Sequence, residues 1–505
     1  MKTTYPKFHS CLIIKRQFSD SLFVSKLLFF IAVLSINTYL YGAPVDGLFE
    51  YTQPDGSTFK ARVTGDEFYA DEETEDGYRI VKDSKSGFWC YARMSANGKQ
   101  FESTGIIVGK GDPSTLKLEK HLRIPKDERK KIQEDNRKKL KRDKKGRPVS
   151  DEDLSSVLPG DGEPSEEEPP IVYAPPSTPT TGARRGLTLL VCFPDRLGDV
   201  TLTKAQVDAY CNQESGYTGF GNNGSVRQYF YEASNGNFTY TNHVTEYFVA
   251  ANPRSYYTDE NIAYGTRARE LIKEALNYLE ANNFDFKTVD ANNNNVIDGI
   301  NCFYAGSCVN AWAKGLWPHM SSGIGFSSAK TGVSSGTYQI TNMGASLELG
   351  TFCHENGHMI CGFPDIYDYD YDSRGGADVF CLMNSGGHGT NPNLPCAYLR
   401  YKAGWAPGTV EFTSTYNKYV TLINQSGNMY LNQFYLYRKS TTEYFIIEYL
   451  RDVHRGTGYL PNSGIAVWHV DQLGNKNDQS YLFQTSHYNY ECALIQADGL
   501  HEFES

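Results

Sequence analysis

The sequence predicts an α+β fold built from more than one domain, and three observations support this prediction. The chain has 505 residues, which exceeds the length of a typical single domain. The apolar run 186–193 has the length of a buried strand, whereas residues 266–279 place apolar side chains at helical spacing. Strand-like runs dominate beyond about residue 412, so we expect residues 412–505 to form a β-rich C-terminal part.

The first 43 residues have the pattern of a secretory signal peptide. Lys26 precedes the apolar run 27–34, and the small residues Gly42 and Ala43 follow that run. The run is too short to predict a membrane span. We therefore expect export to the extracellular space or the cell surface, with a mature chain that starts at residue 44 and has no stable membrane span.

Residues 44–150 form a first region with two kinds of sequence. In residues 44–112, short aromatic runs alternate with turn signals, as in small antiparallel sheets. Residues 113–150 are highly charged, and we expect them to be helical. Residues 151–184 then contain seven prolines and a run of glutamates, a composition that cannot bury a core and predicts an extended linker.

Charge argues against a nucleic-acid-binding protein. The chain has 49 basic and 59 acidic residues, which leaves a net charge of −10. The one locally basic tract, residues 129–145, alternates with acids and is typical of a solvated helix rather than a nucleic-acid-binding arm. Ten of the eleven cysteines follow the signal peptide, and export would allow disulfides among them. Cys302 and Cys308 are close enough for a local bridge, but the pairing cannot be deduced from the sequence.

Residues 354–358 read His-Glu-Asn-Gly-His, the HExxH pattern of zinc peptidases. Four residues are about one helical turn, so His354 and His358 would project from one face and could bind one zinc ion. Glu355 would lie beside them, where a carboxylate can act as a general base. The alternative is two histidines on a solvated helix face, because the short pattern also occurs by chance.

A catalytic zinc site needs a third protein ligand, and Asp365 is the leading choice. Gly362 would let the helix end and the chain turn back toward the metal. The metzincin pattern HExxHxxGxxH places its glycine and its last ligand one residue earlier, and Cys361 stands at that glycine position here. A distant glutamate, Glu411 or Glu443, is the competing choice, and Asp365 would then be a turn residue after Pro364.

Four other residues near the motif are interpreted as structural. We expect Met383 to lie beneath the histidines, as in a methionine turn, although a core methionine would look the same in the sequence. His388 reads as an ordinary loop histidine. Cys353 and Cys361 flank the motif and read as small buried residues.

A second possible metal site lies in residues 290–299. Asp290, Asn292, Asn294 and Asp298 stand at positions one, three, five and nine of a loop that resembles the first part of a calcium-binding loop. Asn295 replaces the glycine at position six, and no glutamate stands at position twelve. Asn-rich turns also form without a metal, so a calcium site and a plain turn both remain open.

The chain resembles the immune inhibitor A-like family of secreted zinc metallopeptidases. The resemblance spans about residues 185–499 and rests on several separated blocks in the same order. The blocks are residues 225–230, 317–319, 352–358, 364–368, 404–405, 443–448 and 464–471.

The resemblance implies a secreted zinc endopeptidase that cleaves proteins or peptides and is made as a zymogen. It implies a zincin-type catalytic domain at residues 185–411 with the motif helix at its centre, and a propeptide at residues 44–150. One zinc ion would be bound by His354 and His358, with Glu355 as the catalytic base. The family continues further, so the C-terminal part is expected to be truncated. The alternative is a secreted binding or surface protein on a peptidase fold whose catalysis has decayed.

Overall fold

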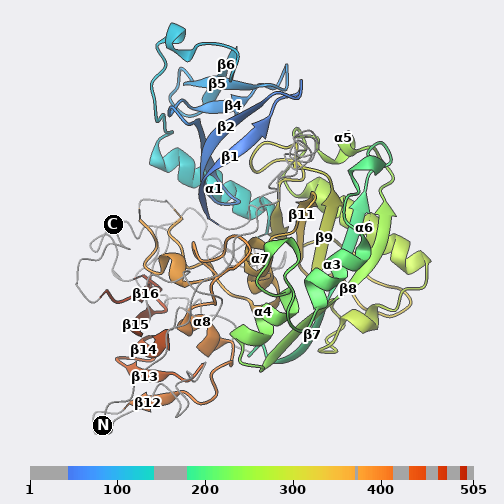
Figure 1. Ribbon diagram of the computed structural model, residues 1–505, viewed down its shortest axis with the longest axis vertical. Coiled ribbons are helices and arrows are strands. Elements are labelled where there is room, and N and C mark those ends of the chain that lie inside the picture. The colour runs from blue at the N-terminus through green and yellow to red at the C-terminus, as the bar shows by residue number, and fades with distance from the viewer. Residues whose placement is uncertain are drawn as a thin grey trace, which may run out of the picture. The chain divides into compact units, whose positions relative to one another are not determined.

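The computed structural model describes residues 44–141, 179–369, 373–412, 432–450, 464–474 and 490–496. The predicted signal peptide, residues 142–178 with most of the predicted linker, and much of the C-terminal part lie outside these residues. Helices and four β-sheets make up the described part of the chain, which confirms the broad α+β class (Figure 1). None of the described helices combines the length and apolar character needed to cross a membrane.

The N-terminal region contains two small antiparallel sheets, as predicted. The first consists of β1 (Val45–Thr52), β2 (Thr58–Gly65) and β3 (Ala70–Thr74), and the second of β4 (Ile80–Lys82), β5 (Trp89–Met94) and β6 (Phe101–Ile107). Of the charged tract expected to be helical, the described part forms a short 3₁₀ turn, Pro113–Leu116, and helix α1 (Lys126–Lys139). Cys90 is buried within β5.

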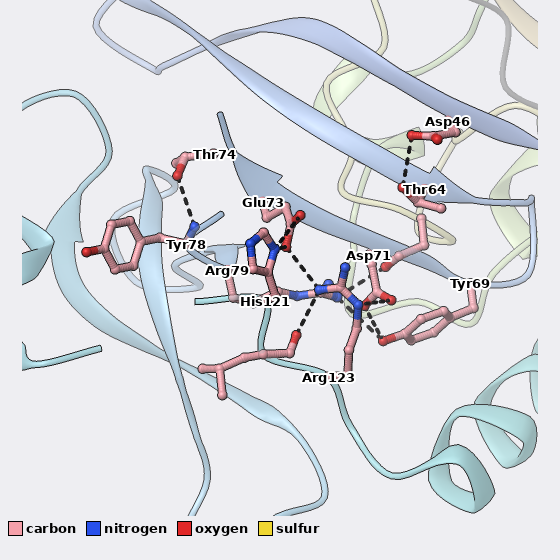
Figure 2. Close-up of polar contacts among 12 residues, drawn as sticks. Asp46, Thr64, Tyr69, Asp71, Glu73, Thr74, Tyr78, Arg79, His121 and Arg123 are labelled. Atoms are coloured by element: carbon pink, nitrogen blue, oxygen red, sulfur yellow. Dashed lines mark hydrogen bonds and ion pairs between the residues drawn. The ribbon is translucent and has the colours of Figure 1, made fainter. Parts of the chain in front are cut away.

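Ion pairs to two buried carboxylates hold strand β3 to the segment that leads into α1, as Figure 2 shows. Asp71 pairs with Arg79 and, over 3.0 Å, with Arg123. The Arg123 guanidinium also reaches Glu73 over 3.0 Å, and the His121 ring lies 3.1 Å from the same carboxylate. Because both carboxylates are less than 10% exposed, removal of Arg123 would leave buried charge behind.

The central sheet has the strand order β10-β11-β9-β7-β8. Its strands are β7 (Gly182–Cys192), β8 (Phe238–Val249), β9 (Ile300–Ala305), β10 (His319–Ser321) and β11 (Tyr338–Met343). The short edge strand β10 runs antiparallel to β11, whereas the other neighbours are parallel. The predicted strand at residues 186–193 is confirmed, but it begins earlier, and Arg184, which was expected in the linker, pairs with β8.

Helices pack against both faces of this sheet. They are α3 (Lys204–Asn212), α4 (Val226–Ala233), α5 (Arg254–Tyr257), α6 (Thr266–Ala281) and α7 (Leu349–Cys361). Leu189 of β7 packs into one core with the apolar stripe of α6, which confirms the helix predicted at residues 266–279. The next residue, Leu190, belongs to a second core that contains side chains of α3, α4 and α7. Because successive side chains of a strand point to opposite faces of the sheet, the helices that pack against them form two layers.

The described C-terminal residues form a second five-stranded sheet, in agreement with the predicted β-rich part. Its strands in spatial order are β12 (Val410–Phe412), β13 (Tyr435–Arg438), β14 (Glu443–Leu450), β15 (Gly464–Asp471) and β16 (Cys492–Leu494). Arg400 of the short helix α8 (Ala397–Lys402) forms a buried ion pair with Glu448 of β14 over 2.6 Å. The Trp468 indole donates to the other oxygen of the same carboxylate over 2.8 Å, so both oxygens of this buried Glu448 are paired.

Candidate metal centre

Helix α7 carries His354, Glu355 and His358. The helix is buried along almost its whole length and ends at Gly362, which adopts a left-handed conformation with φ 64°. The Gly362 N–H donates to the His358 carbonyl over 3.0 Å, closing the last turn. The prediction that Gly362 would end the helix is therefore confirmed, and the chain turns back immediately after it.

Three side chains meet where the chain turns back. Oδ1 of Asp365 lies 3.0 Å from Nε2 of His358 and 3.3 Å from Nε2 of His354. The two Nε2 atoms are 3.2 Å apart. Two ligand atoms bound to one zinc ion at about 2.0–2.1 Å with a tetrahedral angle lie about 3.3 Å apart. The spacing of this cluster therefore fits a zinc ion. Among the described residues, no other group of three or more His, Cys, Asp or Glu side chains lies close enough to hold a metal ion.

Backbone carbonyls orient both imidazole rings. Nδ1 of His354 lies 2.9 Å from the Leu382 carbonyl, and Nδ1 of His358 lies 2.6 Å from the Phe363 carbonyl. A carbonyl can only accept, so each Nδ1 carries a proton, and in the neutral ring each Nε2 then presents a lone pair to the cluster. Two lone pairs and a carboxylate oxygen that face one another over about 3 Å repel unless positive charge lies between them.

The electrostatics of the cluster favour positive charge at this position. Burial lowers the pKa of His354, but the hydrogen bond and charge of Asp365 outweigh that effect and raise it. Burial likewise raises the pKa of Asp365, yet the charge of His358 and the bonds to both histidines hold it well below its usual value. All three side chains are fully buried, so these interactions are poorly screened by water.

Tyr369 orients the third candidate ligand. Its hydroxyl donates to Oδ2 of Asp365 over 2.5 Å, which leaves Oδ1 facing the histidines. Met383 packs beneath helix α7, and a Cβ atom built on Gly357 would lie 2.9 Å from its sulfur. Met383 thus contacts α7 at the glycine between the two histidines, and a larger residue at Gly357 would clash with its sulfur.

Glu355 is not part of the three-residue cluster and lines a small cavity. The cavity lies where α7 meets strands β10 and β11, and His319, Thr341 and Thr351 also line it. Glu355 is close enough to His354 that its charge raises the pKa of that histidine. A carboxylate beside the metal position and open to a cavity can exchange a proton with a water molecule held there.

The competing third ligands lie elsewhere. Glu411 pairs with Arg438 over 3.1 Å, and Glu443 bonds Lys439 and His469, all in the C-terminal sheet. Of the three carboxylates considered as third ligand, Asp365 is thus the one that lies against the histidines. His388 is half-buried, and burial together with the charge of His354 lowers its pKa to about 4.

The predicted calcium loop forms a tight turn. The Asp290 carboxylate accepts the N–H groups of Asn294 and Asn295, each over 2.9 Å. The side chains of Asn292 and Asn294 each accept an N–H two residues further along, over 3.2 and 2.9 Å. Oδ2 of Asp298 accepts the Ala291 N–H over 3.1 Å. Backbone donors thus stabilise the turn through the same oxygens that a calcium ion would need.

Sequence reasoning missed the partners that surround the cluster. Tyr369 follows Asp365 by four residues in a tyrosine-rich stretch, and this spacing was the available signal. The carbonyls of Leu382 and Phe363 carry no side-chain signature at all. Of the flanking cysteines, Cys353 and Cys361 are both buried, as predicted.

The N-terminal region reaches the same site from outside. Nε2 of Gln133, on α1, donates to the Tyr369 carbonyl over 2.6 Å, and the Arg137 guanidinium stacks 4.0 Å above the Tyr369 ring. At the end of α1, the Leu140 carbonyl accepts the Ser321 hydroxyl of edge strand β10 over 2.6 Å. Helix α1 therefore contacts both the tyrosine that orients Asp365 and the strand that borders the cavity.

No family model matches this chain, and no curated protein matches it.

Proposed function

We propose that this protein is a secreted zinc-dependent endopeptidase of the immune inhibitor A-like kind, with a zincin-type catalytic domain, made as a zymogen. The observation that carries the proposal is the meeting of two imidazole lone pairs and one carboxylate oxygen within 3.0–3.3 Å. His354, His358 and Asp365 would hold the ion, one per chain. Zinc bound there would supply a Lewis acid that activates water and polarises the peptide carbonyl.

Glu355 would act as the general base. It lies on the cavity side of α7, next to His354, and is not one of the three clustered ligands. In that position it can take a proton from the attacking water and later deliver it to the leaving amine. The ligand geometry is held by the Leu382 and Phe363 carbonyls and the Tyr369 hydroxyl, so little reorganisation is needed when substrate binds.

The short strand β10 is the proposed docking edge for substrate. It is the last strand of the central sheet and lies beside the cavity that contains Glu355. An extended peptide can add to a sheet edge through main-chain hydrogen bonds, which favours an endopeptidase with broad sequence tolerance. Helix α1 contacts this strand through Leu140 and Ser321, which supports residues 44–150 as an inhibitory propeptide.

The alternative, a secreted binding protein on a decayed peptidase fold, is less well supported. Decay removes a ligand or the base, whereas all four side chains are present here and the three candidate ligands lie in one cluster.

The test uses the purified chain after removal of residues N-terminal to Pro179. We expect one zinc ion per chain and digestion of denatured casein that a chelator abolishes and added zinc restores. Zinc content should fall in the His354→Ala variant, with His243→Ala as the control. A folded, zinc-loaded chain without peptidase activity would favour the binding protein.

A further inference from the structure

Three cysteines from distant parts of the sequence meet in the core between α8 and the C-terminal sheet. Cys396 lies immediately before α8, Cys492 begins β16, and Cys381 lies in the loop before Met383. All three are at most 1% exposed. The sulfur atoms of Cys396 and Cys492 are 3.8 Å apart, although 96 residues separate them in the chain.

The geometry points to a structural disulfide between Cys396 and Cys492, and we propose this pair as a covalent modification site. A disulfide has an S–S distance of about 2.05 Å, so the two sulfurs need to approach by less than about 2 Å. Both cysteines lie at the end of an element, which makes that small approach compatible with the surrounding packing.

The Cys381 side chain also hydrogen-bonds Cys396, but it is the less suitable partner for a bridge. Its sulfur accepts the backbone N–H of Cys396 over 3.3 Å, and a bridge that drew it away would leave this buried donor unsatisfied. Cys381 also precedes Leu382, whose carbonyl orients His354. A bridge from Cys492 leaves this loop in place.

The bridge would add a covalent bond to a short strand that pairs with β15 at the end of the C-terminal sheet. Strand β16 has only three residues. Its Leu494 N–H donates to the Gly376 carbonyl over 2.8 Å, and the preceding Tyr490 hydroxyl donates to Ser373 over 2.8 Å. The Ser373 hydroxyl in turn donates to Asp368 over 2.9 Å. A Cys396–Cys492 bond would therefore hold β16 against the segment that follows Asp365.

The chemistry is a thiol–disulfide exchange during folding, before the core closes. The Cys396 thiolate attacks an external disulfide and displaces one thiol, and Cys492 then attacks the mixed disulfide and releases the second. Two protein thiols are oxidised, and the external disulfide takes up their two electrons and two protons. In the cell this step depends on the proposed secretion, because the cytosol keeps thiols reduced.

The test maps thiols in the full chain, both secreted and refolded from the reduced state in a glutathione redox buffer. Free thiols are alkylated under denaturing conditions, and peptides are identified without reduction. We expect a cross-linked pair containing Cys396 and Cys492, with Cys381 alkylated, in both samples. A bridge in the refolded chain alone would contradict the proposed export but support the site.

A stability measurement provides the independent readout. Reductant should lower the melting midpoint of the parent by several degrees and leave that of Cys492→Ser unchanged. The Cys302→Ser variant, which removes a buried thiol elsewhere, should respond as the parent does. A Cys381–Cys396 bridge, or alkylation of both Cys396 and Cys492 in both samples, would overturn the proposal.

Discussion

Tyr369 donates its hydroxyl to Oδ2 of Asp365 over 2.5 Å, while Oδ1 of the same carboxylate faces His358 over 3.0 Å. The Asp365 carboxylate, a candidate metal ligand, is thus hydrogen-bonded to the tyrosine that contacts helix α1. The Tyr369 side chain therefore links the candidate metal ligand Asp365 to helix α1.

The Tyr369→Phe variant should bind zinc about 10- to 100-fold more weakly, because the hydroxyl orients Asp365 without touching the ion. Competition with a chromogenic chelator measures this affinity. Tyr398→Phe is the matched control, since Tyr398 is an equally buried tyrosine bonded to Glu491. Equal affinity in the Tyr369 variant and the parent would mean that packing alone orients Asp365.

Glu355→Gln should keep the fold and the zinc content but lower casein cleavage by at least about 100-fold, the scale of a lost general base. The control is Glu348→Gln, which changes the residue just before the same helix, outside the three-residue cluster. Metal analysis and a peptidase assay on the trimmed chain decide the matter. Retained cleavage with normal zinc would remove Glu355 from the mechanism.

Arg137→Ala should make the untrimmed chain more active. Its guanidinium stacks between the rings of Tyr369 and Phe68 at 4.0 and 4.8 Å, and a desolvated cation–π contact contributes about 1–2 kcal/mol. Docking of the N-terminal region should weaken by roughly 5- to 30-fold. The control is Arg93→Ala, whose side chain is 62% exposed. If full-length parent and trimmed chain are equally active, residues 44–150 are an ordinary domain.

Trimming should occur before Pro179, because the paired basic residues Arg184 and Arg185 lie inside strand β7 and a cut there would break that strand.

Stability of the N-terminal region should fall as pH rises from about 4.5 to 7. Burial raises the pKa of Glu72 from 4.5 to about 7, against the bond donated by Tyr51 over 2.7 Å. The folded state therefore holds a proton that the unfolded state has already lost in this window, and the stabilisation lost is up to about 3 kcal/mol. Urea unfolding of the full chain across these pH values should show the slope. Glu72→Gln should flatten it, and Glu102→Gln, on an exposed surface, should not.

Millimolar calcium should leave the melting midpoint unchanged. Asp290 already accepts two backbone N–H groups, and Asn292 and Asn294 each accept one. An ion bound only by the folded state would raise the midpoint. A rise that disappears in Asp290→Asn would restore the loop as a calcium site, with Asp285→Asn as the control.

The sequence by itself determined the features that depend on local pattern. Apolar periodicity was enough for β7 and α6, the turn signals for the antiparallel sheets, and the glycine for the end of α7. The one-turn spacing was enough to put His354 and His358 on one face. These features require only neighbours along the chain.

Only the tertiary structure decided which carboxylate joins the histidines and which groups surround them. Asp365 and Glu443 are the same kind of ligand in the sequence, and the turn after Gly362 brings Asp365 to the cluster, whereas β14 pairs Glu443 with Lys439 and His469. The contacts of Tyr369 with α1, and of Cys396 with Cys492, join positions that are 236 and 96 residues apart. Such contacts depend on how whole helices and strands pack against one another. The type of a side chain limits what it can bind, but it does not determine which distant residue lies next to it in the folded chain.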